Sequence, residues 1–236
     1  MSECSCWLYI IGGLIAVILA LAWWLGFFYK MEISESTFPG GTFVYLDWRG
    51  PIRNLKDPFH AVYNAFLAYR GANGESCPTD EQAPSMGIYF DDPGNLVDAS
   101  HFRCCAGFLI LDSTPAAAKR GLIEHMRGKG FLVKDMPRTR SVHGAFPHRV
   151  SMVSYPLGAS RFYPASLAFM GRNMPRYRHM FEAPRPGQPE ESGSVELTQA
   201  GAIHYHFPLE QRAAFMLTKH PTPAWRQPKK YLDIID

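Results

Sequence analysis

The stretch WLYIIGGLIAVILALAWWLGFFY, residues 7–29, separates a short N-terminal segment from the rest of the chain. It contains no charged residue, and an α-helix of this length would extend over roughly 34 Å. The hydrocarbon core of a bilayer is about 30 Å thick, and aromatic residues at both ends of such a stretch are typical of the membrane interfaces. We therefore expect a transmembrane helix over residues 7–29, after a lumenal segment 1–6 and before a linker 30–41.

A cleaved signal peptide is the alternative interpretation of the same stretch. Ala20-Leu21-Ala22 resembles a cleavage site, but residues 1–6 contain no Lys or Arg and the apolar run continues through Phe28. A signal peptide has a basic start and a shorter apolar core, so the pattern favours an uncleaved signal-anchor. Lys30 follows the stretch, and this small excess of positive charge places the folded body in the cytosol.

The net charge of +3 conceals an uneven distribution. Residues 71–100 contain acidic residues but no Lys or Arg, whereas arginine dominates residues 137–186. A basic face is attracted to anionic lipid headgroups or to nucleic-acid phosphates, and a solvated surface that balances the acidic stretch is the alternative. The residues of this predicted basic face are Arg138, Arg140, Arg149, Arg161, Arg172, Arg176 and Arg178.

The sequence lacks the common catalytic motifs, because G-x-S-x-G, a P-loop and H-E-x-x-H do not occur in it. Its five cysteines are odd in number and form no C-x-x-C pair, which argues against a disulfide framework and against a zinc site. We therefore predict a protein that is not an enzyme and that uses no metal or cofactor.

Three polar residues are candidate ligand contacts. His204 and His206 alternate on one predicted strand and so share a face, while Glu196 lies on the neighbouring strand. Two histidines could begin a metal site, but no further ligand is tied to them by spacing. Glu196 is the best carboxylate for a cationic small molecule, although an exposed surface position is the simpler interpretation.

The order of predicted elements repeats a β-α-β-β unit, which indicates an α+β body with two halves related by a pseudo-twofold axis. Strands rich in β-branched and aromatic residues and helices with one apolar face give this order. The body covers residues 42–210, and a proline-containing, extended tail follows over residues 211–236. The first unit is Thr42–Trp48, Asp57–Arg70, Ser85–Phe90 and Phe102–Leu111, and the second is Val142–Phe146, Ser151–Asn173, Val195–Thr198 and Ala202–Phe207.

Several short segments, in order and spacing, resemble the testis-expressed protein 264 family. The resemblance covers roughly residues 7–210. The segments are SMGIYFDDP at 85–93, RCCAG at 103–107, KGF at 129–131, GAFP at 144–147 and IHYHFPL at 203–209.

This resemblance implies a GyrI-like domain, a duplicated β-α-β-β fold shared with bacterial multidrug-sensing effector domains. It also implies a single-pass protein of the endoplasmic-reticulum membrane, with a cytosolic body, that acts as a receptor for selective autophagy of the reticulum and reaches the autophagosome. A link to the p97 segregase and to repair of DNA–protein crosslinks belongs to the same family. The chain departs from the family's long acidic tail, because only about 25 residues follow the domain.

The tail nevertheless contains an aromatic-x-x-aliphatic peptide, Tyr231-Leu232-Asp233-Ile234. Such peptides bind ubiquitin-like autophagy modifiers by adding an edge strand, with the aromatic and aliphatic side chains in two apolar pockets. The pattern is common by chance, since Phe59-His60-Ala61-Val62 also fits it inside a predicted helix.

Three functions follow as hypotheses. The first is a membrane adaptor that tethers the reticulum to the phagophore through the tail peptide. The second is a membrane-tethered GyrI-like domain that binds a small molecule or acts as a scaffold, including as a p97 cofactor in crosslink repair. The third is nucleic-acid contact through the basic face, which would weaken steeply with salt.

Overall fold

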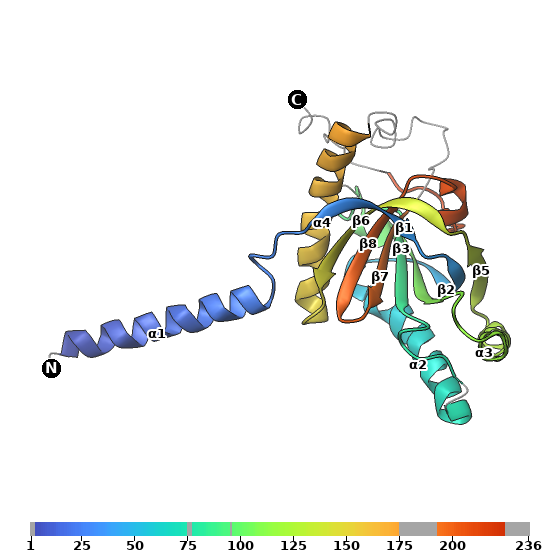
Figure 1. The fold of residues 1–236 in the computed structure, drawn as a ribbon, viewed down its shortest axis with the longest axis horizontal. Coiled ribbons are helices and arrows are strands. Elements are labelled where there is room, and N and C mark those ends of the chain that lie inside the picture. The colour runs from blue at the N-terminus through green and yellow to red at the C-terminus, as the bar shows by residue number, and fades with distance from the viewer. Residues whose placement is uncertain (1–2, 75–76, 95, 175–192, 225–236) are drawn as a thin grey trace.

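A computed structural model of the 236-residue chain describes residues 3–74, 77–94, 96–174 and 193–224. One eight-stranded sheet dominates it, with every neighbouring pair antiparallel and the order β1-β6-β8-β7-β3-β4-β2-β5 (Figure 1). The strands are β1 (Ile33–Phe38), β2 (Gly41–Gly50), β3 (Ser85–Tyr89), β4 (Phe102–Ile110), β5 (Leu132–Met136), β6 (Thr139–Pro147), β7 (Ser194–Gln199) and β8 (Ala202–Pro208). The helices are α1 (Glu3–Trp24), α2 (Lys56–Asn73), α3 (Ala116–Gly128) and α4 (Ser151–Asn173), with short 3₁₀ helices η1 (Ile52–Asn54), η3 (Ala99–His101) and η5 (Arg212–Phe215).

The β-α-β-β order occurs twice in this sheet, as β2-α2-β3-β4 and as β6-α4-β7-β8. Within the sheet the second unit runs β6-β8-β7 and the first runs β3-β4-β2, so the two units meet through β7 and β3. At this junction Glu196 is directly opposite Gly87. The sheet is extended by β5 at one edge and β1 at the other. Because β1 occupies Ile33–Phe38, half of the linker expected over residues 30–41 is a strand paired with β6.

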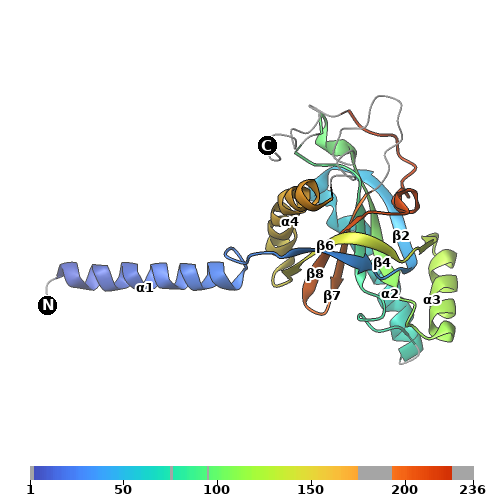
Figure 2. The same ribbon diagram turned by 45° about the horizontal axis from the view of Figure 1, so that its top comes forward.

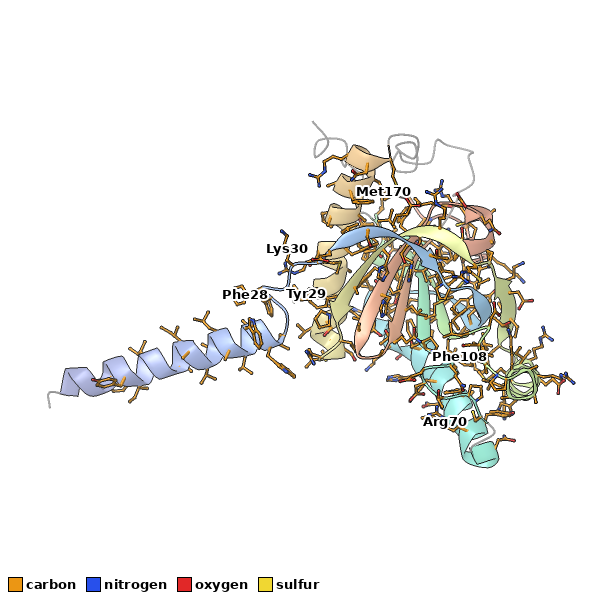
Figure 3. All side chains as sticks on the ribbon, viewed as in Figure 1. Phe28, Tyr29, Lys30, Arg70, Phe108 and Met170 are labelled. Carbon is orange, nitrogen blue, oxygen red and sulfur yellow. The ribbon has the colours of Figure 1, made fainter. Side chains whose placement is uncertain are left out.

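Strand β4 lies near the centre of the first unit and every one of its residues is buried. Helices cover one face of the sheet, where α2 contacts β4 and α4 contacts β6, and α3 packs beside α2 (Figures 1 and 2). Phe108 of β4 packs against the ring of Phe66 on α2, and Met170 of α4 is fully buried (Figure 3). The alternation of side chains along each strand thus gives two distinct apolar layers, one on each face.

Gly107 is required where β4 passes β2. A Cβ at this position would lie 1.9 Å from the carbonyl oxygen of Val44, a backbone atom that cannot turn away. We expect Gly107→Ala to lower the free energy of unfolding by about 3 kcal/mol in urea denaturation. Gly71→Ala on α2 is the matched control, because a Cβ there meets no atom within 4 Å and should raise stability slightly. Equal effects of the two changes would contradict this account of Gly107.

The other face of the sheet, opposite the helices, is covered by the segment Glu210–Ala224, which we call the strap. Phe215 of the strap is 0% exposed and packs edge-on against Phe38. The backbone N–H of Lys219 donates to the Asp47 carboxylate at 2.9 Å, and Val97 N–H donates to the carbonyl of Ala224 at 3.0 Å. The tail expected to be extended from residue 211 is therefore attached to the body as far as Ala224.

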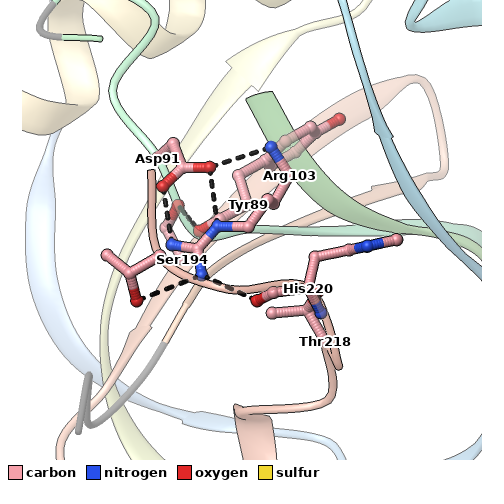
Figure 4. Close-up of polar contacts among 7 residues, drawn as sticks. Tyr89, Asp91, Arg103, Ser194, Thr218 and His220 are labelled. Carbon is pink, nitrogen blue, oxygen red and sulfur yellow. Dashed lines mark hydrogen bonds and ion pairs between the residues drawn. The ribbon is translucent and has the colours of Figure 1, made fainter. Parts of the chain in front are cut away.

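Arg103 and Asp91 form a buried ion pair beneath the strap (Figure 4). Arg103 Nη2 lies 2.7 Å from Asp91 Oδ1, and both Nε and the backbone N–H of Arg103 donate to Oδ2. Nη1 of Arg103 reaches the carbonyl of His220 at 3.3 Å and Thr222 Oγ1 at 3.5 Å. The ion pair thus joins the ends of β3 and β4 to the strap.

Helix α1 projects away from the sheet and ends at Trp24, short of the expected end at Tyr29 (Figures 1 and 2). A turn follows, in which Gly26 has a φ of 88°. The ring of Tyr29 then packs against Phe146, and Arg161 of α4 donates to the carbonyl of Phe27.

Over the part of the chain that the structure describes, no helix is both long and apolar enough to cross a membrane. This finding contradicts the transmembrane helix expected over residues 7–29. The transmembrane part of the predicted fold class, the signal-anchor and the single-pass location in the endoplasmic-reticulum membrane are corrected with it.

Candidate functional site

Glu196 occupies the centre of the sheet, where the two β-α-β-β units meet. It lies on β7 between Gly87 of β3 and Tyr205 of β8, and it is only 8% exposed. The surrounding sequence, Val195-Glu196-Leu197, places the two apolar side chains on the strap face and the carboxyl on the helix face. A carboxyl group is therefore buried between the sheet and its helices.

Burial raises the pKa of the Glu196 carboxyl to about 8, and a hydrogen bond from Tyr89 opposes this shift. Transfer of a carboxylate out of water is costly unless a positive charge or several donors compensate. At neutral pH the group is therefore mostly protonated in the free protein. A cation brought beside it would favour the ionised form and would displace the proton.

Four tyrosines from three elements surround this region: Tyr89 of β3, Tyr155 and Tyr163 of α4, and Tyr205 of β8. Burial raises the pKa of Tyr89, Tyr155 and Tyr205, and the charge of Glu196 raises each of them further. All three hydroxyls consequently stay protonated at physiological pH. The hydroxyl of Tyr205 donates to the carbonyl of Tyr155, that of Tyr155 contacts Thr198, and that of Tyr89 contacts Glu196, while their rings provide an aromatic wall.

Hydroxyl contacts hold two of these rings against β7. Tyr155 Oη lies 2.6 Å from Thr198 Oγ1, and Tyr163 Oη lies 2.8 Å from Ser194 Oγ. Ser194 and Thr198 are two residues before and after Glu196, so their side chains share its face of the strand. Helix α4 is thereby fixed above the carboxyl.

Glycines create the space into which the rings fit. A Cβ on Gly87, directly opposite Glu196, would lie 2.8 Å from the Tyr89 hydroxyl and 3.0 Å from the ring of Phe59 on α2. A Cβ on Gly158 of α4 would lie 2.3 Å from the hydroxyl of Tyr205. Helix α2 thus contributes the ring of Phe59 and helix α4 contributes the close approach at Gly158. The site is therefore built from both β-α-β-β units.

Of the three predicted ligand contacts, only Glu196 belongs to this site. Tyr205 is the direct partner of Glu196, so His204 and His206, one residue to either side, point to the opposite face of the sheet. Within the described residues, no group of three or more His, Cys, Asp or Glu side chains is arranged to hold a metal ion. Glu196 and the two histidines therefore lie on opposite faces of the sheet and do not form one site.

The predicted basic face is dispersed over several elements. Arg138 and Arg149 flank the two ends of β6, which at about 3.3 Å per residue separates them by roughly 30 Å. Arg140 is bound by the carboxylates of Glu35 and Glu210. The side chains of Arg161 and Arg172 of α4 donate to the backbone carbonyls of Phe27 and Ala168.

Two sets of predicted residues lie outside the residues that the structure describes. They are Arg176 and Arg178 of the basic face, and the tail peptide Tyr231, Leu232, Asp233 and Ile234. Binding of that peptide to a ubiquitin-like autophagy modifier stays a prediction.

Sequence reasoning missed the four tyrosines and Gly87. Tyr155 and Glu196 are far apart in the sequence and come near each other only because α4 packs on β6 and β8, from which the side chain of Tyr155 reaches Thr198 of β7. One signal could have identified Gly87. If the second strands of the two predicted repeats pair with each other, Gly87 and Glu196 come together at the centre of the sheet, as they do in β3 and β7.

No protein-family model matches the sequence, and no curated protein matches it. Among solved structures, the EcmrR–DNA complex is 8% identical, with 87% of this chain and 68% of that chain covered and a TM-score of 0.42. SAV2435 bound to tetraphenylphosphonium is 10% identical over 76% of this chain and 94% of that one, with a TM-score of 0.37. A hydrolase from Listeria innocua is 12% identical over 77% and 94%, with a TM-score of 0.40. Likenesses this distant do not assign a function.

Proposed function

We propose that this chain is a ligand-binding domain that holds a small cation with aromatic or apolar substituents against Glu196. The observation that carries this proposal is the buried carboxyl at the junction of the two units, surrounded by tyrosines from β3, α4 and β8. The role is binding, and no catalytic step is part of it.

The chemistry of the site favours a cation over a neutral molecule. A positive charge next to Glu196 would restore the ionised carboxylate in a poorly hydrated place, where charge pairing is strong. Tyrosine rings attract cations through their faces, with about 0.5–2 kcal/mol for each well-placed contact. The apolar surroundings select a cation that is itself weakly hydrated.

Entry of such a molecule requires the rings over Glu196 to move. The hydroxyl contacts of Tyr155 and Tyr163 with β7 are single hydrogen bonds, each worth about 1 kcal/mol net. Breaking both therefore costs about 2 kcal/mol, which the charge pair with Glu196 in a poorly hydrated place can offset. Binding and a small separation of α4 from the sheet are then linked.

Calorimetric titration with tetraphenylphosphonium, a lipophilic aromatic cation, tests the proposal. We expect saturable binding at pH 7, a rise in melting temperature with ligand concentration, and release of close to one proton per ligand. The proton release is measured by repeating the titration in buffers with different ionisation enthalpies. It follows because the pKa of Glu196, about 8 in the free protein, would fall beside a cation.

Glu196→Gln should weaken this binding at least tenfold and abolish the proton release, because the amide cannot ionise. Glu124→Gln, an exposed position on α3, is the matched control and should bind as the unchanged protein does. Triphenylphosphine oxide, which is neutral, should bind much more weakly. Failure of tetraphenylphosphonium to bind, or equal binding by the Glu196→Gln variant, would reject the proposed function.

A further inference from the structure

Three imidazoles gather on the strap face of the sheet, away from the Glu196 site. They belong to His143 of β6 and to His204 and His206 of β8, and we call them the histidine cluster. His143 Nε2 lies 3.1 Å from His204 Nδ1, and the rings of His143 and His206 are 4.8 Å apart between centroids. His206 is 5% exposed, and its Nδ1 lies 2.9 Å from the hydroxyl of Ser141.

Among the residues that the structure describes, no carboxylate acts on His206 from the elements packed around it. Strand β7 places Val195 opposite it, and β1 contributes Phe38. The charges that act on His206, within the part of the chain described, are those of His143 and His204. The charged residue of η5 is Arg212, also a cation, and the carboxylate of Glu210 is bound to Arg140.

A chain of ring contacts connects the histidine cluster to the strap. The ring of His206 meets Phe38 edge to face, with centroids 5.5 Å apart. Phe38 in turn meets Phe215 of the strap in the same manner at 5.3 Å. Because Phe38 and Phe215 are both 0% exposed, a displacement of His206 cannot be absorbed by solvent-filled space.

We propose that the histidine cluster is an acid-sensitive latch that releases the strap from the sheet when its imidazoles take up protons. One proton can be shared along the contact between His143 and His204. A second proton on this pair places two positive charges about 3 Å apart, on His143 and His204. Protonation of His206 places a further charge against the apolar ring of Phe38. Release of the strap admits water to all three rings and removes this cost.

The expected increase in strap release follows from the difference in pKa between a buried and a hydrated imidazole. Burial, together with the charges of His143 and His204, lowers the pKa of His206 to about 3. A hydrated histidine has a pKa near 6.5. If His206 alone regains that value on release, the released population at pH 5 should be about thirtyfold larger than at pH 7.5.

Hydrogen–deuterium exchange of the full chain, read by mass spectrometry at pH 7.5 and pH 5.0, tests the latch. After normalisation for the intrinsic exchange rate at each pH, peptides of the strap should lose protection about thirtyfold at pH 5.0. Peptides from β4, in the centre of the sheet, should keep their protection. Phe215→Ala serves as a positive control and should leave the strap unprotected at both pH values.

His206→Phe keeps an aromatic ring against Phe38 and removes the most deeply buried titrating group of the cluster, so its strap should lose much less protection at pH 5.0 than that of the unchanged protein. His60→Gln, at an exposed position on α2, should behave as the unchanged protein does. A strap whose protection is the same at both pH values would overturn the latch. So would equal loss in the His206→Phe variant, or loss of protection by β4 together with the strap, which would indicate acid unfolding of the whole domain.

Discussion

Replacement of Asp91 by alanine is expected to lower the free energy of unfolding by about 3–5 kcal/mol, the largest loss that we predict for one side chain. Arg103 is 1% exposed, and Asp91 accepts both its guanidinium and its backbone N–H. Without the carboxylate, the buried guanidinium loses its anionic partner, and the carbonyl of His220 and the hydroxyl of Thr222 supply no negative charge in its place. Urea denaturation followed by circular dichroism measures the loss.

Two further variants show whether the loss of stability comes from the burial of this ion pair or merely from the removal of a charge. Asp112→Ala removes a carboxylate from an exposed pair with Lys119 and should cost less than about 1 kcal/mol. The double change Asp91→Leu, Arg103→Met removes both charges and should be more stable than Asp91→Ala alone. Similar losses for Asp91→Ala and Asp112→Ala would show that the buried pair is not the source of stability.

Glu196→Gln is expected to change how stability depends on pH. The folded protein keeps a proton on Glu196 up to a pKa of about 8, whereas the unfolded chain releases it near pH 4.5. The unfolded state therefore binds fewer protons between these values, and stability falls as pH rises through this range. Relative to the unchanged protein, the Gln variant should gain about 3 kcal/mol between pH 5 and pH 8.

The comparison of the two proteins at each pH removes the contribution of His206, which has the opposite sign. Its lowered pKa means that the unfolded state binds more protons below pH 6.5, so its contribution to stability rises with pH up to that value. If the unfolding free energies of the Gln variant and the unchanged protein stay parallel from pH 5 to pH 8, the buried carboxyl is not the group that titrates.

The order of the strands and helices could be predicted from the sequence more completely than the residues of the candidate site. Apolar runs such as Phe102–Leu111 predict buried strands because their composition leaves few alternatives, and β4 occupies Phe102–Ile110. Glu196 could be singled out as a carboxyl within an apolar alternation. The tyrosines around it could not, since helix packing over the sheet decides which rings reach a central strand.

Two differences have local physical causes. The helix at the N-terminus ends at Trp24 because the chain turns at Gly26, where Phe146 packs within 2.8 Å of the position of a Cβ. Composition alone does not reveal such a turn inside an apolar run. The strap is attached because Phe215, in a segment that otherwise looks like a proline-rich tail, finds a place beside Phe38.

The junction of the two units has a consequence for the direction in which a ligand can lie. The second strands of the repeats, β3 and β7, meet so that Gly87 of one unit faces Glu196 of the other. Two carboxyls there would repel each other, and two glycines would leave no charge to bind. The first unit contributes a glycine, which leaves space, and the second contributes the carboxyl. The two repeats are therefore not equivalent at the junction where they meet. An elongated cation would therefore have one preferred heading across the sheet, with its charge toward β7 and its apolar end toward β3.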